Sequence, residues 1–443
     1  MMKNKMKKKP KQSSLDNNSI VKYFKEHKIS TWVVFLFLVY IVLAIKVITF
    51  KNLEESIIFS TYSILVSFYI LSRFGLSYFY EFDEADFDKN YEPTISFAVP
   101  SKNEEENIRE TILRIAKTDY PKKKFDIIAI NDGSTDNTLN EMLEAKKIAA
   151  KMGVKVIVVD WKINKGKREG MAECIRISKN DIMIFIDSDS FVEPDTAKEL
   201  VKYFVDKKIG AVAGHAYVAN VDKNVLTKMQ SVIYYVAFKA YKSSEALFGS
   251  VTCCSGCCSA YRRKYVLKIL NKWSNQKFLG VKCTYGDDRS LTNFILKMGY
   301  KTLYAPEAKS YTFVPETFKQ YRKQQLRWKK SWIRETLKAG TFMWKRNPVA
   351  SLSFYTGAIL SVLAPVVLIR ALIWYPLTTR LIPWFYLFGL LLIAIIYGLF
   401  YYLHTDDKKW LYGTLYSRLY SFILVWQLPW ALFTIRDSRW GTR

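Results

Sequence analysis

The chain has 443 residues, with 67 Lys and Arg against 40 Asp and Glu, and a formal net charge of +27. Half of the residues are hydrophobic, which excludes a disordered chain because disorder requires few large apolar side chains. Six cysteines in this length exclude a disulfide-based scaffold. The excess of basic over acidic residues leaves two classes of partner, nucleic acid and an anionic membrane surface.

The apolar residues are gathered in long runs near both ends of the chain. Residues 31–50 and 57–79 form two runs, and residues 349–376 and 382–403 form two more. About 20 apolar residues cross the hydrocarbon core of a bilayer as a helix. A fifth stretch, 411–435, is interrupted by Arg418 and Pro429 and fits a span, a re-entrant segment or an interfacial helix. This segregation predicts a polytopic membrane protein.

The distribution of lysines predicts which side of the membrane each part occupies. Six of the first twelve residues are lysine and none is acidic, so the N-terminus is expected in the cytosol. The loop between the first two runs is short, which returns the chain to the cytosol before the roughly 230 residues that precede the third run. A cleaved signal peptide is disfavoured, because the basic region is far from the apolar run and no small-residue cleavage site follows. We expect a multi-pass protein of the cell membrane and no nucleic-acid partner.

The cytosolic insert shows alternating strand and helix patterns. Short apolar strands are expected at 94–100, 125–130, 154–160 and 181–186, with helices between them, the first at 104–115. This alternation predicts a parallel sheet that binds its ligands at the carboxyl ends of the strands.

Two polar motifs follow strands of the insert. In NDGS, Asp132 can accept hydrogen bonds from a base or ribose, Gly133 permits a tight turn and Ser134 or Thr135 can cap the next helix. The alternative is a turn and cap without a ligand. In DSDS, Asp187 and Asp189 face the same side if the chain stays extended. Neighbouring carboxylates favour a hard divalent ion that bridges to a diphosphate, and the alternative is a solvated acidic loop.

These and later motifs resemble those of the processive family 2 glycosyltransferases, which include cellulose, chitin and hyaluronan synthases. SGCCSAYRR at 255–263, GDDRSLTN at 286–293, KQQLRWKKS at 323–331 and FTIRDSRWGTR at 433–443 resemble segments of bacterial, streptococcal-type hyaluronan synthases in particular. The motifs run from residue 100 to residue 443, so the resemblance covers most of the chain.

The resemblance implies a Rossmann-like GT-A glycosyltransferase domain of α/β class, inserted between α-helical transmembrane segments with amphipathic interface helices. The expected parts are a basic cytosolic N-terminus (1–30), two transmembrane helices (31–80), the glycosyltransferase domain (81–312), interface helices (313–346) and transmembrane or re-entrant helices (347–443).

The family's functional residues carry over by position. Nucleotide-sugar binding would fall to Pro100, Glu104, Asp132, Lys167, Asp187, Gln324, Arg327 and Trp440. Asp187 and Asp189 would hold Mg²⁺ or Mn²⁺, and the acceptor would contact Ser255, Gly256, Asp287 and Trp328. Asp288 resembles the general base that takes a proton from the acceptor hydroxyl, and the neighbouring Asp287 is expected to raise its pKa.

The basic, aromatic stretch 313–344 predicts an amphipathic helix at the membrane interface. Gln324, Arg327 and Trp328 share one face of that helix. Arg327 can pair with a diphosphate and Trp328 can stack on the acceptor sugar. The alternative is a basic, lipid-facing helix with no chemistry.

Three segments depart from the hyaluronan synthase pattern. Four cysteines surround Ser255 and Gly256, and we favour packing beside the acceptor over a zinc or redox site because no histidine is near. The segments 214–220 and 237–242 differ at Ala219, Tyr241 and Lys242, which bears on the choice of sugar and not on the reaction. His215 is expected to be structural.

The sequence therefore predicts an inverting, processive β-glycosyltransferase that polymerises UDP-sugars on the cytosolic face and exports the polysaccharide. By resemblance the donors are UDP-GlcNAc and UDP-GlcA, and the partners are the nascent polymer and the bilayer, with no obligate protein partner. One alternative is a chitin-like or poly-GlcNAc synthase that uses a single donor. A non-processive lipid-carrier transferase is disfavoured by QQLRW, and a non-catalytic scaffold by the retained aspartates.

Overall fold

The computed structural model describes residues 29–51, 57–80 and 91–438. The eight strands of the main sheet are β1 (Ile95–Ser101), β2 (Phe125–Asp132), β3 (Lys155–Trp161), β4 (Ile182–Phe185), β5 (Ser190–Val192), β6 (Ile209–Val218), β7 (Ser259–Arg262) and β10 (Lys301–Thr312). A separate hairpin consists of β8 (Lys277–Phe278) and β9 (Val281–Lys282). The four expected strands are confirmed as β1 to β4.

The sheet is mixed, and the expectation of a parallel sheet is wrong for two of its strands, β5 and β7. The strand order is β3-β2-β1-β4-β7-β6-β10-β5. Strands β1 to β4 run parallel, but β7 is antiparallel to both β4 and β6, and β5 is antiparallel to β10. Strands β6 and β10 are parallel to each other and run in the direction of β1 to β4. The two short strands β5 and β7 run the other way, and the carboxyl ends of β1, β2 and β4 stay together at one edge.

The helices of the sheet domain are α4 (Ile108–Ala116), α5 (Thr138–Lys151), α6 (Lys167–Ile177), α7 (Thr196–Val201), α9 (Ser243–Ala246), α10 (Arg263–Ser274) and α11 (Asp287–Lys297). Helix α4 begins four residues later than its expected start at Glu104. Helices α4 and α5 pack on each other and on β2, while α6, α10 and α11 form a second packed group. Every residue of β1 is buried, so this part of the sheet forms the centre of the core.

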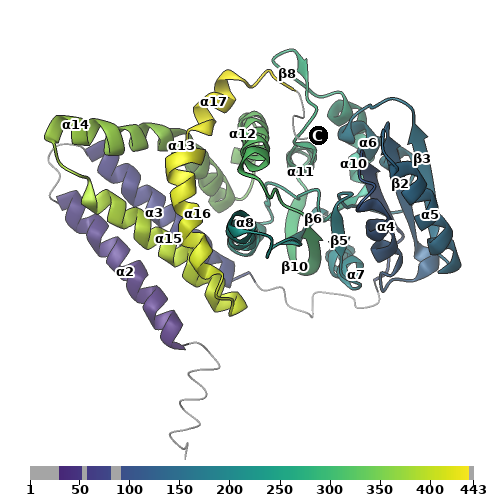
Figure 1. The fold of residues 1–443 in the computed structure, drawn as a ribbon, viewed down its shortest axis with the longest axis horizontal. Helices are drawn as coiled ribbons and strands as arrows, with labels where there is room; N and C mark the ends of the chain where they lie inside the picture. Colours follow the sequence, from purple (N-terminus) through teal and green to yellow (C-terminus); the bar gives the residue numbers. More distant parts are fainter. Residues whose placement is uncertain (1–28, 52–56, 81–90, 439–443) are drawn as a thin grey trace, which may run out of the picture.

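Helices from both ends of the chain form a bundle beside the sheet domain (Figure 1). They are α2 (Ile29–Lys51), α3 (Ile57–Tyr78), α13 (Pro348–Ile369), α14 (Tyr375–Thr379), α15 (Trp384–Thr405), α16 (Trp410–Leu419) and α17 (Gln427–Phe433). The four expected apolar runs are thus helical, and the fifth stretch is broken into α16, a π-helical turn at Tyr420–Leu424 and α17.

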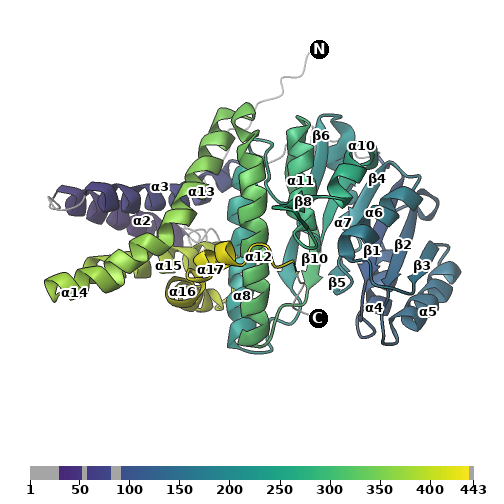
Figure 2. The ribbon, with the colours of Figure 1, turned by 90° about the horizontal axis from the view of Figure 1, so that it is seen from above.

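Two helices, α8 (Val225–Val236) and the longer α12 (Phe318–Gly340), stand between the sheet and the bundle (Figure 2). Helix α8 contacts β6 on one side and α15 and α16 on the other, and α12 contacts both α11 and α17. The helix expected within 313–344 is therefore confirmed as α12, and its place at a membrane interface stays a prediction. Its position makes it the physical link between the strand ends and the apolar helices.

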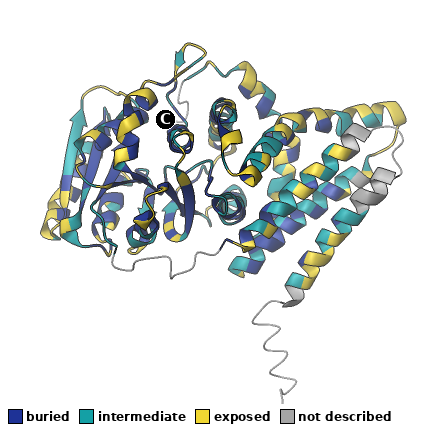
Figure 3. Ribbon diagram, turned by 180° about the vertical axis from the view of Figure 1, so that it is seen from behind, coloured by how far each residue is buried: buried dark blue, intermediate teal, exposed yellow. Residues whose placement is uncertain are grey.

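The surface of the bundle is unusually apolar for a protein in water. Leu352 and Leu377 are 70% and 75% exposed, and Figure 3 shows exposed positions along these helices. Among the described residues, two stretches are long and apolar enough to cross a bilayer, Pro348–Thr379 and Tyr386–Thr405. Trp32–Ala44 is apolar but shorter. Exposed apolar surface of this extent indicates contact with lipid or protein.

Candidate active site

The predicted site residues meet in one cavity of about 2000 Å³ at the carboxyl edge of the sheet. Twelve of the fourteen line it: Pro100, Asp132, Lys167, Asp187, Asp189, Ser255, Gly256, Asp287, Asp288, Gln324, Arg327 and Trp328. Glu104 does not; it is buried beneath the edge, where its N–H donates to Thr138 Oγ1 at 2.7 Å. Trp440 lies outside the described residues.

Asp132 fixes the loop that leads into α6. Its two carboxylate oxygens accept the N–H groups of Lys165 and Gly166 at 2.6 and 2.9 Å. Gly133 has φ of +63°, and a Cβ there would lie 2.6 Å from the nitrogen of Asn164, so the glycine is needed for this close approach. Nucleotide binding by Asp132 stays a prediction, but the aspartate has a clear structural task.

The prediction that Ser134 or Thr135 caps the next helix is wrong. Helix α5 starts at Thr138, and its N-cap position is Asn137. Ser134 instead accepts the N–H of Asn103 through its hydroxyl at 3.0 Å, and Asn103 Oδ1 accepts the N–H of Thr135 at 2.9 Å. The motif therefore joins two strand-end loops.

Lys167, the first residue of α6, forms an ion pair with Asp187. Burial lowers the pKa of the Lys167 ammonium, but Asp187 and the more distant Asp287 and Asp288 outweigh it and leave the pKa raised. Lys167 is therefore a fixed positive charge at the strand ends.

Asp187 and Asp189 both line the cavity, although a turn rather than an extended chain brings them together. The N–H of Ser190 donates to the carbonyl oxygen of Asp187 at 3.0 Å and closes this turn. Burial first, and then the charge of Asp187, raise the pKa of Asp189 to about 6, against the opposing effects of Lys167 and Arg327. A cation bound beside both carboxylates would relieve the repulsion between them.

Ser255 and Gly256 lie against that acidic pair. A Cβ on Gly256 would stand 3.0 Å from Asp187 Oδ1 and 3.4 Å from Lys167 Nζ. The Ser255 hydroxyl accepts from Lys242 Nζ at 3.2 Å. The predicted acceptor segment is thus next to the predicted metal site.

The GDD motif opens α11. Gly286 has φ of +75°, and a Cβ there would collide with the Ser331 side chain of α12. Asp287 and Asp288 occupy the first turn of the helix, where the helix dipole favours negative charge. Asp288 accepts the N–H of Arg289 at 2.7 Å and receives the Cys253 thiol at 3.6 Å.

Asp287 has a different environment from Asp288. Its Oδ1 pairs with Arg168 Nε at 2.5 Å, and the two side chains are only 5% and 4% exposed. Arg168 supplies a counter-charge to Asp287, and the expected effect of Asp287 on its neighbour stays a prediction. Binding of the acceptor by Asp287 stays a prediction.

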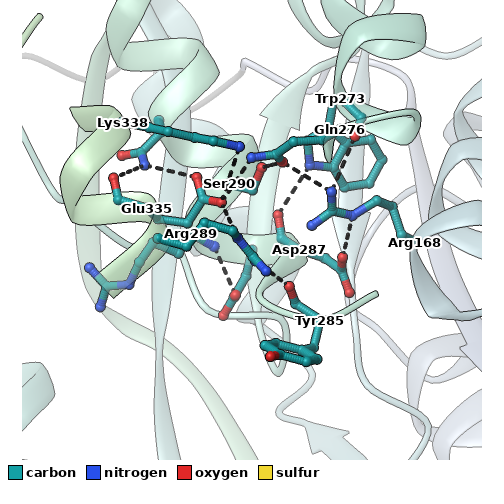
Figure 4. A network of polar contacts seen from close by, with 12 residues as sticks. Arg168, Trp273, Gln276, Tyr285, Asp287, Arg289, Ser290, Glu335 and Lys338 are labelled. Atoms are coloured by element: carbon teal, nitrogen blue, oxygen red, sulfur yellow. Dashed lines mark hydrogen bonds and ion pairs between the residues drawn. The ribbon is translucent and has the colours of Figure 1, made fainter. Parts of the chain in front are cut away.

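The Arg168–Asp287 pair belongs to a buried polar network that reaches α12 (Figure 4). Arg168 Nη1 donates to Gln276 Oε1 at 3.0 Å, and Gln276 Nε2 donates to Glu335 Oε1 at 2.9 Å. Glu335 also pairs with Arg334 at 2.8 Å. Two features of the sequence indicate that Arg168 and Glu335 belong to the site. Arg168 adjoins Lys167, and Glu335 is the one acidic residue of a basic helix.

Helix α12 presents Gln324, Arg327 and Trp328 to the cavity. Gln324 Oε1 is buried and has no hydrogen-bond partner among the described residues, so it has an acceptor available to a ligand. Burial lowers the pKa of Arg327, while Asp187, Asp287 and Asp288 oppose that shift. The Trp328 side chain is 42% exposed.

The cysteines support the packing interpretation. All six are free, Cys254, Cys257 and Cys258 are buried, and burial raises the pKa of Cys254 to about 12. In the part of the chain that the structure describes, no group of three or more His, Cys, Asp or Glu is placed to hold a metal. His215 is buried with its Nδ1 against the Tyr304 hydroxyl, and burial lowers its pKa to about 3, as expected for a structural residue.

The mixed sheet with acidic motifs at its strand ends has the arrangement of a GT-A-like glycosyltransferase fold. Residues 93–331 match the family model described as glycosyltransferase like family 2. The chain belongs to this family and is a glycosyltransferase.

Relatives span nearly the whole chain. A hyaluronan synthase of Streptococcus pyogenes is 29% identical over 412 residues, which cover 92% of this chain and 96% of the relative. An N-acetylglucosaminyltransferase of Azorhizobium caulinodans is 32% identical over 354 residues, which cover 79% and 87%. A mannosyltransferase from Pyrobaculum calidifontis, solved in complex with GDP-Man and Mn²⁺, shares the fold with a TM-score of 0.57 at 17% identity, covering 86% of this chain and 99% of that one.

The contact of Gly256 with the Asp187–Lys167 pair generates a first prediction. Gly256→Ala pushes a methyl group to 3.0 Å from Asp187 Oδ1, which shifts that carboxylate and should lower the transfer rate roughly tenfold. The measurement is nucleotide release from the sugar donor. Gly75→Ala, which meets nothing within 4 Å, is the control, and equal rates for both variants would contradict the assignment.

The buried Arg168–Asp287 pair generates a second prediction. Arg168→Ala leaves a buried carboxylate without its counter-charge, which should cost about 3–5 kcal/mol of unfolding free energy. The measurement is thermal unfolding of the purified protein. Arg176→Ala removes exposed pairs with Glu169 and Glu173 from the same helix and should cost about 0–1 kcal/mol. Equal unfolding temperatures for the two variants would show that the network stabilises nothing.

Proposed function

We propose that the chain is a membrane-embedded, inverting and processive β-glycosyltransferase that extends a polysaccharide on the cytosolic face and exports it, with hyaluronan as the product. The observation that carries this proposal is the continuity of the cavity. It is lined by Asp288 and Lys167 at the sheet and by Tyr62, Gly357 and Tyr397 of the apolar helices α3, α13 and α15.

The size of the cavity supports polymerisation. Pockets for a single small ligand have volumes of about 300–1,000 Å³, and this cavity has about 2000 Å³. It has room for a nucleotide sugar at the strand ends and for several further sugar units toward the apolar helices. A transferase that modified one lipid-linked sugar would need no such extension.

A divalent cation fits the acidic pair. Asp187 and Asp189 would hold Mg²⁺ or Mn²⁺, which offsets negative charge on the diphosphate of the leaving group. Two carboxylates suffice, because Mg²⁺ commonly takes one or two carboxylates with phosphate oxygens and water as its other ligands. Burial and the neighbouring charge of Asp187 raise the pKa of Asp189, and a bound cation would offset both effects.

The other roles fall to side chains already placed in the cavity. Asp288 accepts the proton of the acceptor hydroxyl as that oxygen attacks the anomeric carbon and the nucleoside diphosphate departs. Lys167 and Arg327 supply positive charge to the diphosphate, and Trp328 offers its exposed ring to the acceptor sugar. One base and direct displacement invert the anomeric configuration.

The donors are UDP-GlcNAc and UDP-GlcA in this proposal, supported by relatives named hyaluronan synthases across 92% of the chain. An alternative is a polymer of N-acetylglucosamine from UDP-GlcNAc alone, because relatives of similar identity are named N-acetylglucosaminyltransferases. A multi-pass location in the cell membrane is supported by the two apolar stretches in the described residues.

A donor assay tests the choice of sugar. The purified full chain is incubated with single UDP-sugars and with pairs, and UDP release and product mass are measured. We expect high-mass product only from UDP-GlcNAc with UDP-GlcA, and its degradation by hyaluronan lyase. High-mass product from UDP-GlcNAc alone would replace the hyaluronan proposal by the alternative.

Asp288→Asn tests the base. Loss of a positioned general base should lower UDP release by about 10²-fold to 10⁴-fold, with the best donor pair and saturating metal. The control is Asp181→Asn, which alters an exposed carboxylate that contacts Thr94 at the far end of the sheet. Full UDP release by the Asp288 variant would remove the residue from the reaction.

A further inference from the structure

The apolar helix α3 carries a single charged residue, Arg73. Its side chain is buried, with 5% exposure, yet it lines the same cavity as Asp288. Helix α3 contacts α2 and α13, so Arg73 lies inside the bundle that we propose to be embedded in the membrane. Ionisable residues are costly in such helices and are found where they face a partner or a ligand path.

The described contacts of Arg73 are all with neutral groups. Nη1 donates to Ser353 Oγ at 2.6 Å, while Nε and Nη2 lie 3.4 and 3.2 Å from Ser72 Oγ. The guanidinium stands 4.9 Å from the centre of the Tyr69 ring. No carboxylate of the described chain lies within ion-pair distance of Arg73, so its charge has no counter-ion there.

Glu245 is a carboxylate that lines the same cavity, but its oxygens are engaged elsewhere. They accept the N–H and hydroxyl of Thr252 at 2.9 and 3.0 Å. A second cation, Lys242, also lines the cavity and donates to neutral acceptors, the carbonyl oxygen of Cys253 at 2.6 Å and the Ser255 hydroxyl at 3.2 Å. The part of the cavity between the acceptor segment and α3 is therefore lined by two cations, Lys242 and Arg73, whose described hydrogen bonds are to neutral groups.

We propose that Arg73 is a binding site for the carboxylate of a uronic acid residue on the polymer as it leaves the active site. A guanidinium presents paired N–H donors that match a carboxylate, and successive uronic acids would bring a new carboxylate past Arg73 with each repeat. A neutral polymer offers no such partner. The inference rests on the proposed function and adds a contact that would hold the acidic polymer between the apolar helices.

Product length under varied salt tests the site. Wild type, Arg73→Gln and Arg73→Lys are purified in detergent and supplied with UDP-GlcNAc and UDP-GlcA from low to high salt. Arg73→Gln removes a charge-assisted hydrogen bond between the protein and the polymer in a desolvated site. We therefore expect its product to be shorter than that of wild type, on the order of tenfold. Wild-type product should shorten as salt rises, whereas the Gln variant should lose this dependence.

Two further variants separate charge from structure. Arg73→Lys keeps the charge without the planar fork and should retain most of the product length, whereas a purely structural arginine would not be replaced by lysine. If Arg73→Gln is not recovered as folded protein, the salt response of wild type carries the test, because a product length that does not change with salt would overturn the site. Arg370→Gln, which removes an arginine in the bundle that is not among the residues lining the cavity, should leave product length unchanged.

The outcomes distinguish this inference from the proposed function. If wild type makes no polymer from any donor, the proposed function fails and the Arg73 site falls with it. If wild type makes an acidic polymer and Arg73→Gln matches it in length and salt response, the Arg73 site alone is overturned. Polymer from UDP-GlcNAc alone also overturns the site, while processive polymerisation stands.

Discussion

Negative charge is crowded at the carboxyl edge of the sheet, and the rest of the site is arranged around that constraint. Carboxylates that share a partly buried site repel one another and require cations beside them. In each acidic motif one carboxylate is fixed by a protein cation, Asp187 by Lys167 and Asp287 by Arg168. The second carboxylate of each motif, Asp189 and Asp288, also lines the cavity. In each motif, one of the two carboxylates is thus held by a cation of α6.

Both cations come from the first two residues of α6. The position of that helix therefore sets the distance between the proposed metal site and the proposed base. Asp132 in turn holds the loop before α6 through two backbone N–H groups. The buried network continues from Arg168 through Gln276 to Glu335 of α12 (Figure 4), so the helix that carries Arg327 is tied to the same frame.

The sequence predicted those features that local pattern controls. Strands β1 to β4 are short apolar runs that end in polar residues, and this pattern suffices to identify them in the sequence. The spacing of Gln324, Arg327 and Trp328 places them on one helix face, and they do line one cavity. The antiparallel strands escaped prediction because β7 and β5 have four and three residues, and such short segments carry little periodicity.

Contacts between distant segments also escaped prediction. Arg168 and Asp287 are 119 positions apart, and no local pattern indicates that they pair. Asp132 has the residue type expected of a ligand, but its oxygens are used by a loop more than 30 positions away. The extension of the cavity into α3, α13 and α15 depends on how helices from both ends of the chain pack, which composition alone does not determine.

The central claim is that one cavity serves both synthesis at Asp288 and passage between the apolar helices. The most direct test places the protein in sealed vesicles with its sheet domain outward and supplies labelled donors outside. The account predicts product inside the vesicles, resistant to an added degrading enzyme until detergent opens the membrane. Product that is fully degraded while the vesicles remain sealed would contradict it, because the polymer would then be released on the side where it is made.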